Sequence, residues 1–115
     1  MSCNYYIHTR DIDMIFDLGI RVYPIHSKKV FECHIAQTCG NLKPLFESHS
    51  YTTFKELKSI LLNKKYDFEI VDEYGRTISP KDFISYMERD NANGKTRFEM
   101  PINNEGYQFF DKDFS

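Results

Sequence analysis

Residues 52–90, TTFKELKSILLNKKYDFEIVDEYGRTISPKDFISYMERD, contain the pattern that decides the fold, because they predict a helix, a strand and a second helix. Thr53 and Glu56 form a capping box, in which each side chain satisfies a backbone N–H group at the start of a helix. We expect this helix over residues 53–64, ending near cations that suit the negative end of its dipole. Its apolar face is formed at helical spacing by Phe54, Leu57, Ile60 and Leu61.

The rest of this stretch predicts a strand over residues 68–75, which runs into a turn at Gly75. Ser79 fits the N-cap of the second helix, because its hydroxyl can accept from a free N–H group there. Pro80 fits the first helical position. The apolar stripe of this helix is Phe83, Tyr86 and Met87.

Outside this unit, β-forming residues that alternate between apolar and polar predict further strands. We expect strands over residues 4–8, 19–25, 30–37, 41–46 and 95–102, and a short helical turn or a loop over 11–18. In the strand over 30–37, the expected buried face is Phe31, Cys33 and Ile35, and His34 is expected to face solvent. These elements predict an α+β fold, a mostly antiparallel sheet with two helices packed on one face.

With 115 residues, the chain is expected to form one domain, residues 1–115. Within it, residues 103–115 form a tail that either docks through its aromatics or stays loose. The sequence has no apolar run long enough for a membrane span, so we expect a cytoplasmic protein. Three cysteines, an odd number, favour free thiols over a disulfide framework. The oligomeric state stays open.

Charge is distributed unevenly along the chain. Residues 1–65 carry nine Lys/Arg against six Asp/Glu, whereas residues 66–115 carry six against eleven. An acidic half can complement a basic surface that handles nucleic acid, and it can also serve only to keep the domain soluble.

Metal binding is the first chemistry to consider. Cys33, His34 and Cys39 lie in one segment, but zinc usually takes two closely spaced Cys/His pairs, and neighbours on a strand point to opposite faces. We therefore expect no metal and no cofactor, and a zinc-binding regulator is the alternative, completed by Cys3, His26 or His49. A cysteine nucleophile would need a histidine within hydrogen-bond reach, which no local motif marks.

Two other groups of charged side chains suggest chemistry. Carboxylates around the predicted turn could bind a divalent ion or act as acid and base, although surface charge is the usual role: Asp67, Glu69, Asp72 and Glu73. Cations along the first predicted helix could contact a nucleic-acid backbone: Lys55, Lys58, Lys64 and Lys65. Because the whole chain is acidic, direct binding of nucleic acid is an alternative and not the expectation.

Four stretches together resemble a family of small tailed-phage and prophage proteins. They are MSCNYYIHT, CHIAQTCGNLKPLFESHSYTTFKEL, IVDEYGRTISPKDFISYME and the terminal NNEGYQFFDKDFS. The most specific likenesses are the Asp-Glu-Tyr-Gly turn at 72–75 and the Glu-Gly-Tyr-x-Phe tail at 105–109. The chain departs from the family at residues 36–39, where the family has Gly-Lys-Ser-Ser, and at Leu42, where the family has an aromatic.

The resemblance implies a phage context, in which small proteins often inhibit a host enzyme or defence system. We therefore expect a non-enzymatic inhibitor, such as an anti-CRISPR protein, that binds a host nuclease complex by surface complementarity. Aromatic side chains provide buried contact, and carboxylates complement a cationic groove. The residues expected to bind the partner are Asp72, Glu73, Tyr74, Glu105, Tyr107 and Phe109.

Overall fold

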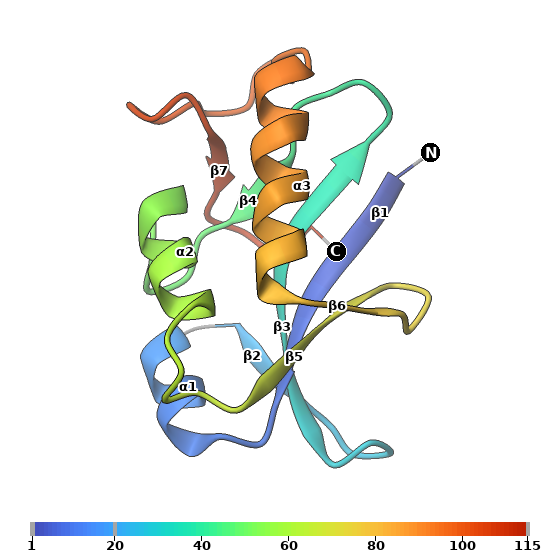
Figure 1. Ribbon diagram of the computed structural model, residues 1–115, viewed down its shortest axis with the longest axis vertical. Helices are drawn as coiled ribbons and strands as arrows, with labels where there is room; N and C mark the ends of the chain where they lie inside the picture. The colour runs from blue at the N-terminus through green and yellow to red at the C-terminus, as the bar shows by residue number, and fades with distance from the viewer. Residues whose placement is uncertain (1, 20, 115) are drawn as a thin grey trace.

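The computed structural model describes residues 2–19 and 21–114, which form one mixed sheet and three helices (Figure 1). The strand order is β6-β5-β1-β3-β4-β7, and β2 pairs with β3 along the same edge as β4. All pairs are antiparallel except β4 with β7. The strands are β1 (Ser2–Thr9), β2 (Val22–Ile25), β3 (Val30–Cys39), β4 (Leu45–Glu47), β5 (Phe68–Asp72), β6 (Thr77–Ile78) and β7 (Gln108–Phe110).

Three helices pack on one face of this sheet, as Figure 1 shows: α1 (Ile12–Leu18), α2 (Phe54–Leu61) and α3 (Pro80–Asn93). The predicted α+β fold with a mostly antiparallel sheet is confirmed, and α1 is added to the two expected helices. The helices and the sheet share one core, whose fully buried side chains include Ile7, Met14, Ile35, Phe46, Leu57, Ile70 and Phe83. None of the helices in the described residues is long and apolar enough to cross a membrane.

The predicted caps of α2 and α3 are confirmed. The Thr53 hydroxyl accepts from the Glu56 N–H at 3.1 Å, and the Glu56 carboxylate accepts from the Thr52 N–H at 3.1 Å. The Ser79 hydroxyl accepts from the Asp82 N–H at 3.1 Å. The capping residues therefore set where both helices begin.

A register shift between β1 and β3 changes which side chains face the helices. Tyr5 pairs with Ala36 and Tyr6 with His34, so Ile35 is the extra residue in β3. Cys33 and Ile35 are buried in the core, as expected, and Ala36 joins them because of the bulge. The expectation that His34 faces solvent is wrong, because its side chain is 5% exposed.

Residues 95–102, which we expected to form a strand, form a loop. The side chain of Gln108 occupies the hydrogen-bonding groups that Arg97 would use in a strand. Gln108 Oε1 accepts from the Arg97 N–H at 2.8 Å, and Gln108 Nε2 donates to the Arg97 carbonyl at 3.1 Å. Glu99 has a φ of 61°, which also breaks extended structure. The short strand β6 and the last turn of α3, through Asn93, lie outside our predictions.

The C-terminal tail docks against the body. Strand β7 pairs in parallel with β4 and stacks Phe109 on Phe46, with ring centroids 5.2 Å apart. Tyr107 stacks on Phe54 of α2 at 4.4 Å. The chain's last segment therefore closes the sheet edge that β4 would otherwise leave unpaired.

Gly94, which follows α3, provides a test of this packing. A Cβ at this position would lie 2.6 Å from both the Asp90 carbonyl oxygen and the Lys43 nitrogen, which are backbone atoms that cannot turn away. We expect Gly94→Ala to lower the free energy of unfolding by about 1–3 kcal/mol, measured by urea denaturation. Asn93→Ala, at an exposed neighbouring position, is the control and should change it by less than about 0.5 kcal/mol. Equal stability of the two variants would contradict the close approach.

Candidate functional site

The sheet face opposite the helices carries two groups of polar side chains that come together. Strand pairing places Tyr6 between His34 and Val71, and His8 between Glu32 and Glu69. This open face has two parts: a buried charged cluster where β3, β4 and the tail meet, and an acidic hollow between β3 and β5.

Glu47 is the centre of the buried cluster. Its side chain is 1% exposed, and such burial of a carboxylate requires cationic or hydrogen-bonding partners. Arg21 Nε donates to Glu47 Oε2 at 2.6 Å, and Arg21 also donates to the Ser48 carbonyl. His34 Nδ1 lies 2.9 Å from the other carboxylate oxygen, Oε1. The carboxylate thus links the loop before β2 to β3 and β4.

The imidazole of His34 is held on every side. Its Nε2 lies 2.9 Å from Asn4 Oδ1, an oxygen that also accepts from Gln37 Nε2 at 3.4 Å. The rings of Tyr6 and Phe114 contact it edge to face, with centroids at 5.3 and 4.7 Å. The ring therefore has one fixed orientation, in which Nδ1 faces the Glu47 carboxylate.

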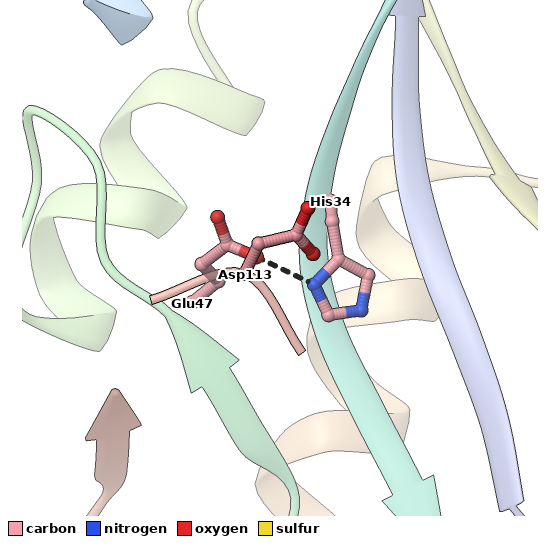
Figure 2. Close-up of side chains that lie close together, drawn as sticks. All are labelled: His34, Glu47 and Asp113. Carbon is pink, nitrogen blue, oxygen red and sulfur yellow. Dashed lines mark hydrogen bonds and ion pairs between the residues drawn. The ribbon is translucent and has the colours of Figure 1, made fainter. Parts of the chain in front are cut away.

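Asp113 brings a second carboxylate to the same place. Figure 2 shows Glu47 and Asp113 approaching the ring of His34, with Asp113 entering from the C-terminal segment. One ligand atom from each of the three residues lies within 4.8 Å of the others. We call His34, Glu47 and Asp113 the His34 cluster. Asp113 is exposed, so the cluster can be reached from solvent on one side.

Cys33 and His49 form a thiol–imidazole pair beside this cluster, with Sγ and Nε2 3.2 Å apart. The same Nε2 lies 2.7 Å from the His34 carbonyl oxygen, which can only accept, so this nitrogen carries a proton and donates it. It cannot take a proton from the thiol. Burial, followed by the charge of Glu47, raises the pKa of the Cys33 thiol, so this pair is not an activated nucleophile.

The acidic hollow, the second part of the open face, has a volume of about 600 Å³. Two cations, Arg10 and Lys28, line it, together with Tyr6, His8 and Val71. His8 Nε2 lies 2.7 Å from Glu32 Oε2 across the strands. Five carboxylates also line it: Glu32, Asp67, Glu69, Asp72 and Glu73.

Two of the six residues expected to bind a partner, Asp72 and Glu73, line the hollow, and Tyr74 follows them in the same turn. Asp72 is buried in the β5–β6 turn, where it accepts from the backbone N–H groups of Tyr74 and Arg76, both at 2.9 Å. Glu73 is exposed and accepts from the Asn4 N–H at 2.7 Å. Tyr74 is 62% exposed, with the Arg76 guanidinium 5.3 Å from its ring centre.

The other three belong to the C-terminal segment that contains β7, which lies on the other side of α3 from the β5–β6 turn in Figure 1, and they contribute to the fold. Glu105 accepts from the first N–H groups of α2, at Phe54 and Lys55, at 2.7 and 2.9 Å. Tyr107 is half-buried against Phe54, and Phe109 is in the core. The six expected residues therefore do not form one continuous surface.

The structure also bears on the two alternative functions, zinc binding and nucleic-acid binding. The described side chains close enough to hold an ion are the His34 cluster, not the cysteines, because Cys33 faces the core and Cys39 ends β3. Along α2, Lys58 pairs with Glu88 at 3.2 Å. Lys65, beyond the helix, pairs with Asp17 at 3.7 Å. Neighbouring carboxylates therefore partly neutralise the expected cationic strip.

Sequence reasoning missed Glu47 and Asp113. One weak signal existed, a single acidic residue after Leu45 and Phe46 in an otherwise apolar stretch. Its partners come from segments 13 and 26 residues away, which no local pattern connects.

Comparisons with protein-family models, curated proteins and solved structures find no significant match to this chain. Function must therefore be inferred from the geometry of the open face.

We predict that Cys33 is inert in the folded protein. A thiol reagent such as DTNB at pH 8 should leave Cys33 unmodified until the chain is unfolded, because burial shields it and disfavours its thiolate. Cys33→Ser is the matched variant, and it should leave the number of thiols that react in the native state unchanged. Loss of one rapidly reacting thiol in that variant would contradict the burial of Cys33.

Asp72 predicts a pH dependence of stability. Burial would raise its pKa, but hydrogen bonds from the backbone and guanidinium of Arg76 and from Tyr74 outweigh burial, so the pKa lies below its ordinary value. A carboxyl with a lowered folded pKa stabilises the fold above its unfolded pKa, and this contribution is lost as the pH falls through the folded value. Asp72→Asn should therefore be less stable than wild type at pH 7, with the difference shrinking below about pH 4. Urea denaturation at pH 7 and below about pH 4 measures the stability difference between wild type and Asp72→Asn. A difference that is the same at both would refute the prediction.

Proposed function

We propose that this protein acts by binding, and that its acidic hollow receives a basic surface of a macromolecular partner. The observation that carries this proposal is the lining of the hollow, in which five acidic residues outnumber Arg10 and Lys28, although one of the five, Asp72, is paired with Arg76 at 2.7 Å. Carboxylates gathered in a concave surface focus a negative potential, which attracts and orients a cationic partner.

The hollow suits a flat or convex protein surface better than a small molecule. Its floor is formed by the paired strands β1, β3 and β5, and its aromatic and apolar lining includes Tyr6, Val30, Phe68 and Val71. The exposed ring of Tyr74, in the turn at its rim, adds a side chain of the type that often anchors interfaces.

Resemblance to phage proteins supports a host defence protein as the partner, and a nuclease complex has the cationic groove that the hollow would complement. In this proposal the protein is a phage-derived inhibitor, of the anti-CRISPR type, that competes with nucleic acid for that groove. Its action is stoichiometric, and it requires no catalytic group.

Glu69 provides the test, because its side chain is exposed at the hollow and its strand position tolerates a long polar residue. We expect Glu69→Lys to reduce both capture of the partner from host lysate and inhibition of the host nuclease by roughly tenfold or more. The reason is that the new lysine would face the cationic side chains of the partner. Glu99→Lys, an equally charged and exposed change outside the hollow, is the control and should retain both activities.

Binding by wild type should also weaken as salt is raised, since it depends on charge. The proposal fails if both variants inhibit like wild type, or if wild type leaves nuclease activity and phage plating in a defended host unchanged.

A further inference from the structure

We propose that His34, Glu47 and Asp113 bind a divalent first-row transition-metal ion at the junction of β3, β4 and the C-terminal segment. This site uses different residues from the acidic hollow, so it stands or falls independently of the proposed function.

Hydrogen bonding around His34 is the first argument. The Asn4 oxygen accepts at Nε2, and the donation of Gln37 to that oxygen fixes the orientation of the Asn4 amide. Nε2 therefore donates a proton to Asn4. Nδ1 lies 2.9 Å from Glu47 Oε1, so this position either carries the second ring proton, donated to Glu47, or offers a lone pair to a metal ion that Glu47 also binds.

The donor types favour the metal ion, and the distances are compatible with it. Adjacent donors around an octahedral ion with bonds near 2.1 Å lie roughly 3 Å apart, which matches the separation of Nδ1 and Oε1. Asp113 places a second carboxylate oxygen within 4.8 Å of one ligand atom of His34 and one of Glu47. One imidazole and two carboxylates form a mixed nitrogen–oxygen set that suits Mn²⁺, Fe²⁺ or Zn²⁺.

The surroundings have the features of a prepared site. Arg21 and His49 approach Glu47 at Oε2, at 2.6 and 3.6 Å, and leave Oε1 directed at His34. Asn4 supplies the outer hydrogen bond that orients a ligating imidazole. Glu47 and His34 are buried, whereas Asp113 is exposed and leaves a path for the ion and for its water ligands.

Binding would join the tail to the sheet. Asp113 lies beyond β7, and His34 and Glu47 lie in β3 and β4. An ion shared by the three fixes the C-terminal segment over the open face, next to the Phe114 ring that already contacts His34. We therefore expect metal to raise the thermal unfolding temperature of the whole chain.

Manganese is the best probe, because it prefers nitrogen and oxygen donors and discriminates against the free thiols. Titration of the full chain at pH 7.5, with free Mn²⁺ followed by electron paramagnetic resonance, should show one ion bound per chain. Asp113→Asn should weaken binding at least tenfold without unfolding the protein, since this side chain is exposed. Asp111→Asn, at an exposed position two residues earlier, is the matched control and should bind like wild type.

Nuclear magnetic resonance of the histidine ring nitrogens distinguishes a second ring proton on His34 Nδ1 from a bound metal ion. In the presence of one equivalent of Zn²⁺, the Nδ1 signal of His34 should show a ligated nitrogen without a proton, and Nε2 should keep its proton. Retention of protons on both nitrogens at saturating zinc would overturn the site. So would absence of Mn²⁺ binding by wild type, or equal binding by wild type and Asp113→Asn.

Discussion

The buried carboxylate of Glu47 is the group on which the arrangement of the open face depends. A carboxylate that is 1% exposed costs several kcal/mol in desolvation unless partners surround it, so the chain must bring Arg21, His34 and His49 to it. These partners come from the loop before β2, from β3 and from the segment after β4. One charge therefore sets how three separate segments meet, and removal of any partner would leave the others buried and incompletely paired.

The two faces of β3 have different surroundings. Cys33, Ile35 and Ala36 pack towards the helices, while Glu32 and His34 belong to the open face. The bulge at Ile35 makes this division possible beyond the strand's midpoint, because it places Ala36 in the core while His34 stays beside Tyr6. The core and the proposed binding surface thus lie on opposite sides of one strand.

Much of the fold could be predicted from local pattern, because its determinants are local. The caps at Thr53 and Ser79 and the apolar spacing of α2 and α3 act within a few residues, and both helices begin where those patterns indicate. The loop over residues 95–102 could not be predicted, because Gln108, eleven residues from Arg97, takes the backbone groups that a strand would use. His34 was misplaced for a similar reason. Alternation in a strand predicts that one face is exposed to solvent, but Glu47 and Phe114, from distant segments, cover the His34 side chain on that face.

The same limit applies more strongly to function, since sites are assembled from residues that sequence separates. The excess of acidic residues in the second half of the chain was visible in the sequence, yet these residues do not gather on one surface. Glu32 from the first half joins Glu69 and Glu73 in the hollow, while Glu105 turns inwards to cap α2. Net charge by segment therefore gives the sign of the surface but not its place. The place is set by strand pairing, because β5 lies against β1 and β1 against β3, and this order brings carboxylates 37 residues apart onto a single face.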